Sequence, residues 1–270
     1  MKTPEFVFLA VSLAVSVDAT AAGDVHGGAE RSVACQACHG GDGISISPDI
    51  PNLAGQKSEY LTQQLKAFRA GDRKHDVMNP IARQLSDADI ANLAAFWNSL
   101  PSAGTRKDAA PAALLARQSV MTFPADFPKG FTVYRTEEDV QQQNVSVSYA
   151  NDTALKAARA GESLPDGSII VVTNMPVKLD ASQKPVLDSK GHMIPEGAPR
   201  SYSAMEARAG WGKDLPELLR NGEWSYALFN AQKARADKFN YAMCFACHKS
   251  VEADSYVFTL KKLVEKAKES

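Results

Sequence analysis

All four cysteines of the chain lie in two Cys-x-x-Cys-His strings, at residues 35–39 and 244–248. Two thiols at this spacing can form thioethers with the two vinyl groups of one porphyrin, and the adjacent histidine can ligate the iron from the same face. The sequence therefore predicts two covalently bound haem c groups. The thioethers are expected at Cys35, Cys38, Cys244 and Cys247, and the proximal iron ligands at His39 and His248.

Paired cysteines have two other common uses, as redox-active disulfides and as zinc ligands. Neither use explains why a histidine follows both pairs. Zinc ribbons also usually close over a far shorter separation than the one between Cys38 and Cys244. Thiols of an exported protein otherwise tend to oxidise, so export and haem attachment are consistent with each other.

The first 22 residues predict a secretory signal peptide. An apolar run at residues 6–17 follows a basic start and precedes small residues, with cleavage expected near Ala21 or Ala22. About a dozen apolar residues is short of the roughly 20 that span a bilayer. No later segment is apolar enough to span, so we expect a periplasmic protein with no membrane span after cleavage.

The length of 270 residues suits two domains, each able to bury its own core. We expect domains at 23–101 and 122–270, joined by a linker at 102–121 that has a weak helical pattern around 112–117. The hydrophobic content of 44% and charged content of 23% are typical of globular proteins. The net charge of -1 gives no reason to expect nucleic acid as a partner.

Two helices are expected in the first domain, because apolar residues recur at three- and four-residue spacing over 60–68 and 90–97. The second helix follows a capping-box-like sequence at 86–89 and ends before Pro101. Between the helices lies Met78, whose thioether can complete the iron coordination opposite the proximal histidine.

A neutral sulfur ligand favours ferrous iron, so Met78 as a ligand would raise the reduction potential. An ordinary packing role for Met78 is one alternative. Ligation by the neighbouring His75 is the other.

Several residues of the first domain form a recognisable set. They are 38–40, 51–56, Tyr60, Leu61, Gln64, Leu65, Phe68, Gly71, Arg73, Met78 and 85–87. With this set the domain resembles the small class I cytochromes c, single-haem and tandem bacterial proteins that shuttle electrons in the periplasm. The resemblance implies an all-α fold, Met78 as the distal ligand, and a Pro51 carbonyl that accepts the N–H of the proximal imidazole.

The second domain is not a repeat of the first, because its attachment string lies near its end and any distal ligand must come mostly from upstream. Runs of β-branched and aromatic residues predict antiparallel strands, and a polar stretch with three prolines predicts a long hairpin excursion. The expected strands include 131–134, 145–149 and 168–173, the excursion spans 178–200, and helices are expected at 231–244 and 257–268.

A second set of residues accompanies these strands. They are 164–171, 210–212, Trp224, 244–248 and 256–259. With this set the domain resembles the cytochrome P-460 family, which groups hydroxylamine-oxidising cytochromes with gas-binding β-sheet relatives of cytochrome c′. The resemblance implies an α+β, mainly antiparallel-sheet, haem-binding domain. It also implies an iron with histidine on one side and an open or substrate-bound position on the other.

One departure from the family pattern matters. Hydroxylamine-oxidising members have a lysine bonded to the porphyrin, commonly on the strand after the Asp-Gly turn, and here residues 169–173 contain none. Lys178 is the nearest lysine and is interpreted as a surface residue. Other residues considered as distal ligands of the second iron are Met175, Met193, Met205 and His192.

These features predict a dihaem redox protein that has an unidentified redox partner protein. The first haem would carry electrons, and the second would bind or transform a small nitrogen- or oxygen-containing molecule. If the second haem transforms its ligand, the protein is a haem-dependent oxidoreductase. The alternatives are a nitric oxide binding protein without turnover and a plain two-haem electron carrier.

Overall fold

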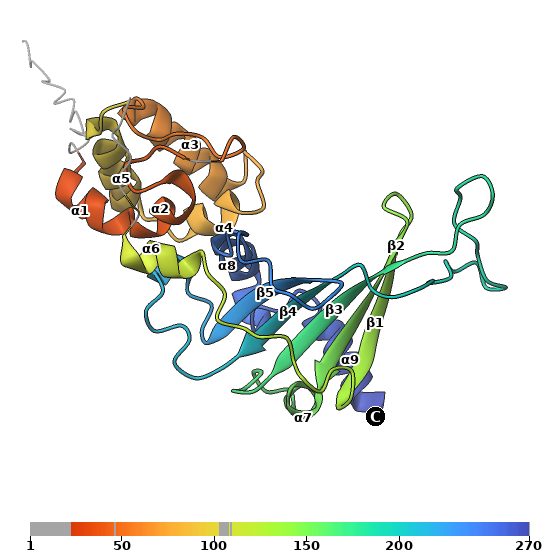
Figure 1. The fold of residues 1–270 in the computed structure, drawn as a ribbon. Helices are drawn as coiled ribbons and strands as arrows, with labels where there is room; N and C mark the ends of the chain where they lie inside the picture. The colour runs from red at the N-terminus through yellow and green to blue at the C-terminus, as the bar shows by residue number, and fades with distance from the viewer. Residues whose placement is uncertain (1–22, 46, 103–107, 109, 270) are drawn as a thin grey trace, which may run out of the picture.

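The computed structural model of the protein describes residues 23–45, 47–102, 108 and 110–269. A helical N-terminal domain packs beside a C-terminal domain built on one antiparallel sheet (Figure 1), as predicted. The signal peptide predicted at 1–22 and linker residues 103–107 and 109 lie outside the described residues. Within the described part of the chain, no helix is long and apolar enough to cross a membrane.

The N-terminal domain consists of helices joined by loops. Its described helices are α1 (Val25–Arg31), α2 (Val33–His39), α3 (Ser58–Ala70), α4 (Met78–Arg83) and α5 (Asp87–Ser99). The two predicted helices are α3 and α5, and α5 begins with the expected capping box between Ser86 and Asp89. The unpredicted α1 packs on α5, where a Cβ at Gly28 would lie 2.1 Å from the carbonyl oxygen of Asn92.

The predicted linker contributes to the packing between the domains. Helix α6 (Pro111–Ala116) confirms the weak helical pattern and packs against α2. Ala113 and Ala116 are fully buried, and the amide of Ala110 donates to the Gln36 side chain at 2.9 Å. The described part of this segment is therefore a packed element.

The C-terminal sheet is a five-stranded antiparallel meander in chain order. Its strands are β1 (Phe131–Asp139), β2 (Asn144–Asn151), β3 (Ile169–Pro176), β4 (Ser201–Ala207) and β5 (Trp224–Asn230). The first three were predicted, although each is longer than expected, whereas β4 and β5 were not. Helix α7 (Asp152–Ala160) connects β2 to β3.

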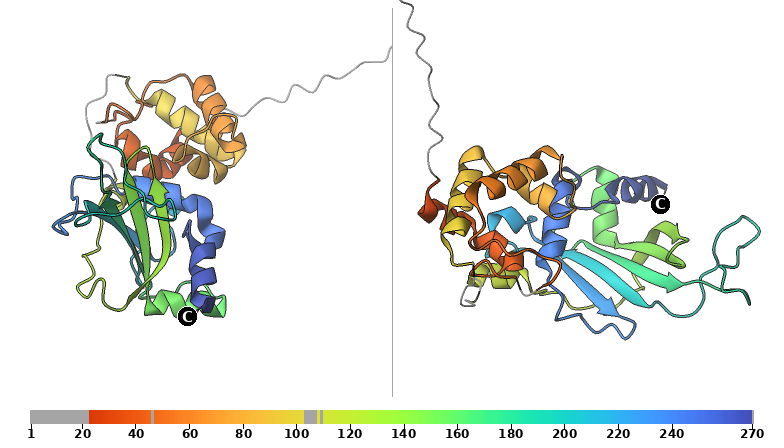
Figure 2. Two further views of the ribbon diagram at one scale, coloured as in Figure 1. Left: turned by 90° about the vertical axis from the view of Figure 1, so that its right-hand side faces the viewer. Right: turned by 90° about the horizontal axis from the view of Figure 1, so that it is seen from above.

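The two faces of the sheet have different covers. Phe123 and Phe127 pack edge-on against Tyr202 and other aromatic residues of one face. On the other face Tyr226 contacts Phe245 of α8 (Ala242–His248). Figure 2 shows α8 and α9 (Leu260–Glu269) on this second face, so the second attachment string is held against the sheet.

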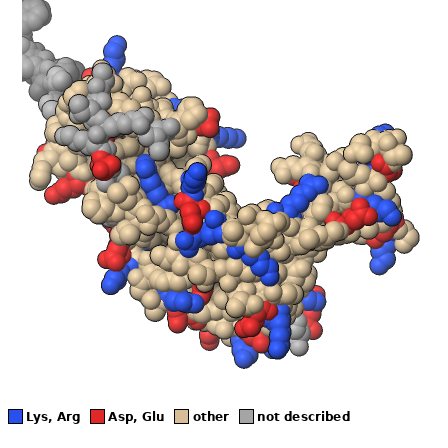
Figure 3. Space-filling model, in the orientation of Figure 1, with Lys and Arg blue, Asp and Glu red and all other residues tan. Residues whose placement is uncertain are grey.

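Residues 177–199 form the expected excursion, here called the projecting ribbon. Isolated bridges pair Val177 with Pro195 and Leu187 with Met193. Figures 1 and 2 show the ribbon extending from the end of the sheet that lies away from α8. Figure 3 shows a hollow between the ribbon and the helical domain, with basic and acidic side chains interspersed on both.

The prediction of a helix at 231–244 was wrong. The Asn230 side chain accepts the amides of Gln232 and Ala234, and Arg235 bridges back to Phe229, so the chain makes a hairpin turn. Only the last part of the predicted range is helical, because α8 begins at Ala242.

The terminal helix was predicted at 257–268 and is present as α9. It begins at Leu260, later than predicted, and it is separated from η2 (Lys249–Asp254) by a turn in which Ser255 and Tyr256 have positive φ angles of 54° and 61°.

Candidate haem centres

The first attachment string lies within helix α2. Cys35 and Cys38 are three residues apart, so they share one face of the helix, and neither is in a disulfide. Burial raises the pKa of the Cys35 thiol to about 12 and also raises the pKa of Cys38. Both are therefore neutral thiols at pH 7, unlike the reactive thiolates of redox-active pairs.

The second string lies within α8 and has the same character. Burial raises the pKa of Cys244 to about 12, and burial together with the Asp76 carboxylate raises the pKa of Cys247. In the described residues no three His, Cys, Asp or Glu side chains are grouped to hold a metal ion. The two cysteine pairs thus form separate sites, against the zinc alternative.

His39 is held in the orientation of a proximal ligand. Its Nδ1 lies 2.8 Å from the carbonyl oxygen of Pro51, which confirms the predicted contact. A carbonyl only accepts, so Nδ1 carries the proton and Nε2 would be the nitrogen available to a haem iron. Burial lowers the pKa of His39, which favours the neutral, ligating imidazole.

His248 repeats this arrangement in the second domain. Its Nδ1 lies 2.7 Å from the carbonyl oxygen of Tyr256, and burial lowers its pKa. The ring packs between Tyr226 and Phe258, with centroid distances of 4.4 and 5.0 Å. The carbonyl that orients it comes from Tyr256, whose left-handed backbone is unusual for a tyrosine.

A buried hydrogen-bond pair fixes Tyr226 next to α8. The fully buried Asn221 donates from Nδ2 to the Tyr226 hydroxyl at 2.9 Å and to the Phe245 carbonyl at 2.8 Å. Burial raises the pKa of Tyr226 far above its ordinary range, so the phenol is neutral. Asn221 therefore ties β5 to the helix that contains the attachment string.

Met78 is the first residue of α4 and is half-buried. The amides of Val77 and Met78 donate to Nδ1 of His75 at 3.2 and 3.3 Å. The Asn79 side chain donates to the carbonyl oxygens of Phe68 and Arg73. His75 therefore uses Nδ1 to shape the loop, and ligation of iron by Met78 stays a prediction.

The two attachment helices meet where the domains join. Asn240, just before α8, donates to the Ala37 carbonyl of α2 at 2.9 Å. Gln84 at the end of α4 donates to the Leu218 carbonyl at 3.2 Å. Two strings that are far apart in sequence are thus brought into one structural junction.

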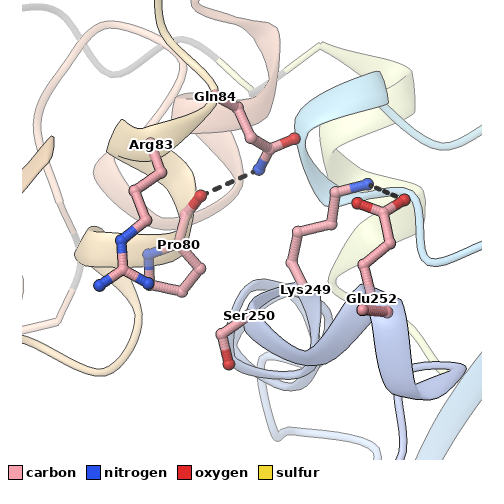
Figure 4. A pocket seen from close by; sticks show the side chains of 7 residues that line it. Pro80, Arg83, Gln84, Lys249, Ser250 and Glu252 are labelled. Atoms are coloured by element: carbon pink, nitrogen blue, oxygen red, sulfur yellow. Dashed lines mark hydrogen bonds and ion pairs between the residues drawn. The ribbon is translucent and has the colours of Figure 1, made fainter.

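A cavity of about 450 Å³ opens at the same junction (Figure 4). It is lined by Pro80, Arg83 and Gln84 from the first domain and by Lys249, Ser250, Glu252 and Ala253 from the second. The Lys249 ammonium donates to the Arg220 carbonyl at 2.9 Å and lies 3.5 Å from Glu252. The cavity therefore connects the helix that begins at Met78 with the turn that follows His248.

Two family models match the chain. Residues 28–101 match Cytochrome c, and residues 124–259, half of the chain, match Cytochrome P460. The chain belongs to both families. The predicted fusion of a cytochrome c domain to a P460 domain is thereby confirmed, and both domains imply haem c binding.

Individual relatives are similar over about a third of the chain. Cytochrome c-554(548) of Halomonas halodenitrificans is 46% identical over 81 residues, which are 29% of this chain and 98% of that protein. Cytochrome c4 of Pseudomonas aeruginosa is 40% identical over 34% of this chain and 46% of its own length. The thiosulfate dehydrogenase electron acceptor of Stutzerimonas stutzeri is 40% identical over 27% of this chain and 36% of its own length. The chain spans less than half the length of these last two relatives.

The residues present fit a haem c group in each domain. Each string offers two neutral thiols on one helix face and an imidazole whose Nδ1 is bound by a backbone carbonyl. Such a partner fixes the ring and leaves Nε2 as the ligand atom. The cytochrome c domain and the P460 domain use the same local device in unrelated folds.

The structure separates most of the other candidate ligands of the P460 domain from His248. Lys178 and His192 are exposed on the projecting ribbon, and His192 bonds Glu138 at 2.9 Å. Met193 is buried in a small cluster at that end of the sheet, with Met175 packed against it. Met205 differs, because it is paired with Tyr226 in the β4–β5 register and faces the side of the sheet that holds α8.

Four residues of these centres were missed by sequence reasoning. Tyr256 was noted only within a family string, where nothing indicated that its carbonyl would contact the ring of His248. Tyr226, Asn221 and Asn240 give no periodic or motif signal, because their roles depend on partners in other elements.

Proposed function

We propose that this chain is a periplasmic dihaem c-type cytochrome in which electrons pass between the two domains and a small ligand is bound or transformed at the P460 haem. The observation that carries the proposal is the pair of oriented imidazoles. Nδ1 of His39 and of His248 lie 2.8 and 2.7 Å from backbone carbonyl oxygens, on helices that meet at one junction.

The cytochrome c domain is proposed as the electron-carrying half. His39 and Met78 would ligate its iron from opposite sides, which leaves no position for a substrate. Its relatives include a protein named as an electron acceptor of thiosulfate dehydrogenase. Electron exchange with a separate redox protein is accordingly proposed for this domain.

The P460 domain is proposed as the half that binds a small molecule. His248 would supply one axial ligand, and the ribbon residues considered as a second ligand lie at the other end of the sheet. An iron with one protein ligand can bind nitric oxide, carbon monoxide, hydroxylamine or peroxide. The proposed class of ligand depends on an open coordination position opposite His248.

A second candidate function is capture of nitric oxide without turnover. None of the five strands that the structure describes contains a lysine, and Lys178 is exposed on the projecting ribbon. A lysine bonded to the porphyrin is the feature expected of hydroxylamine-oxidising members. Its absence from these strands favours binding, or a different reaction, over hydroxylamine oxidation.

The test uses the full chain produced with haem attachment. A Cys35→Ala/Cys38→Ala variant should retain only the P460 haem and show a high-spin ferric spectrum. The matched Cys244→Ala/Cys247→Ala variant should show a low-spin spectrum. Two low-spin spectra would support a plain electron carrier, and turnover of hydroxylamine with an electron acceptor would separate an enzyme from a binding protein.

A further inference from the structure

Asn240 makes contacts with both attachment helices at once. Its Nδ2 donates to the Ala37 carbonyl at 2.9 Å and lies 3.8 Å from the sulfur of Cys38. Its Oδ1 accepts the amide of Ala242 at 3.1 Å, in the first turn of α8. One half-buried side chain therefore joins the end of α2 to the start of α8.

These bonds satisfy backbone groups that helices leave unpaired. The last carbonyls of a helix and its first amides have no partner within the helix. Ala37 supplies such a carbonyl in α2, and Ala242 supplies such an amide in α8. The junction is thus specific in geometry, because a displaced α8 would lose the bond between Asn240 and the Ala37 carbonyl.

Arg117 strengthens the same junction from the linker side. Its guanidinium donates from Nε to the Ala37 carbonyl and from Nη2 to the Gln36 carbonyl at 3.2 Å. Its own carbonyl accepts the amide of Tyr241 at 3.2 Å. The Arg117 guanidinium bonds to backbone carbonyls, whereas Asn240 combines a docking bond to the Ala37 carbonyl with a contact to the sulfur of Cys38.

The path from Asn240 to the second string is short. Tyr241 follows Asn240 directly, and its carbonyl accepts the amide of Cys244 at 2.9 Å. A continuous series of covalent and hydrogen bonds therefore leads from the Cys38 sulfur, through Asn240 and Tyr241, to Cys244. Both ends of this series are attachment cysteines.

We infer that Asn240 is the residue that couples the two haems, positioning the attachment helices and supplying the bonded path between their thioethers. This inference rests on the proposed function. With haem c bound at both strings, one electron would cross the junction, so that one iron would change from Fe(II) to Fe(III) and the other from Fe(III) to Fe(II), with no proton transferred. Asn240 acts as a positioning residue and as a hydrogen-bond donor toward the Cys38 sulfur.

The test compares variants of the full holoprotein. Asn240→Leu has a similar size but loses the donor and the acceptor. Asn98→Leu is the matched control, since Asn98 makes a side-chain bond to the Gln56 carbonyl at 2.9 Å within the first domain. Arg117→Gln weakens docking to Ala37 without touching the sulfur contact.

Interhaem transfer is measured as the first-order phase, independent of protein concentration, that follows rapid photoreduction. Asn240→Leu should slow this phase several-fold and lower the potential of the N-terminal haem, because a hydrogen bond to sulfur stabilises the reduced state. Asn98→Leu should match the wild type. Arg117→Gln should lower the unfolding temperature with a smaller loss of rate.

The outcomes separate the inference from the proposed function. An unchanged rate and potential in folded Asn240→Leu would overturn the role of Asn240 and leave the function intact. A two-haem wild-type protein without a concentration-independent phase would overturn the relay itself. If Asn240→Leu does not fold, Asn240→Ser, which retains a short hydroxyl for the Ala242 amide, is measured by the same criteria.

Discussion

The imidazole Nδ1 of His248 lies 2.7 Å from the carbonyl oxygen of Tyr256, eight residues further along the chain. Two consecutive left-handed residues, Ser255 and Tyr256, turn the backbone so that this carbonyl faces the ring. Only glycine adopts such φ angles without steric cost. The chain thus maintains a strained turn where it orients the proposed iron ligand.

Replacing Ser255 by glycine should relieve that strain. The φ angle of 54° favours glycine, and we expect the free energy of unfolding to rise by about 0.5–1 kcal/mol. The matched control is Ala253→Gly in η2, where an ordinary backbone predicts a loss of similar size. Denaturant unfolding of both variants checks this, and a loss of stability in Ser255→Gly would contradict it.

Asn221→Leu should be markedly destabilising. The substitution leaves the buried Tyr226 hydroxyl and Phe245 carbonyl without their donor, at a cost of about 1–3 kcal/mol. Asn98→Leu, an exposed asparagine, should stay within about 0.5 kcal/mol of the wild type. Chemical denaturation compares the two, and equal stabilities would show that the buried bonds contribute nothing.

The capping box of α5 should make a pH-dependent contribution to the free energy of unfolding. Burial raises the pKa of Asp89, but hydrogen bonds from Ser86 and the nearby Arg31 outweigh it and hold the pKa below its ordinary value. As pH falls, the unfolded chain binds this proton first, so the contribution is present above about pH 4 and is lost below it.

Asp89→Asn should therefore lower stability by about 1 kcal/mol at pH 7. The difference from the wild type should shrink as pH falls below about 4. Unfolding titrations across this range measure the difference, and a gap that is constant with pH would refute the assignment.

Met78→Ala should lower the reduction potential of the N-terminal haem, because a soft sulfur ligand favours ferrous iron. The potential of the C-terminal haem should not change. Met121→Ala, which truncates a fully buried methionine in the linker, is the control and should leave both potentials in place. Spectroelectrochemical titration resolves the two couples, and an unchanged first potential would mean that another residue ligates there.

Local sequence patterns predicted the parts of the fold that depend on local energetics. Helix α5 carries its own cap and apolar stripe, and β3 is a β-branched run after an Asp-Gly turn. Strands β4 and β5 consist largely of Ser, Ala and aromatic residues. Most of β5 and the second half of β4 are buried on both faces, so neither strand shows the sustained alternation that marks a half-exposed strand.

The candidate attachment residues were recognisable in the sequence because thioether formation demands a fixed local spacing, and haem attachment at them stays a prediction. Their surroundings were not, since the contacts are long-range. Asn240 is 202 residues from Cys38, and the bond appears only when two domains pack together. The wrong helix at 231–244 has a local origin, because the side chain of Asn230 directs a hairpin turn that an amphipathic pattern does not reveal.

Carbon monoxide binding to the fully reduced protein tests the central claim most directly. The measurement is the number of carbon monoxide molecules bound per covalently attached haem, with the haem count taken from the denatured protein. Two attached haems and one bound carbon monoxide per chain are predicted, with the ligand at the haem of Cys244 and Cys247. Binding of none or of two, or fewer than two attached haems, would contradict the account.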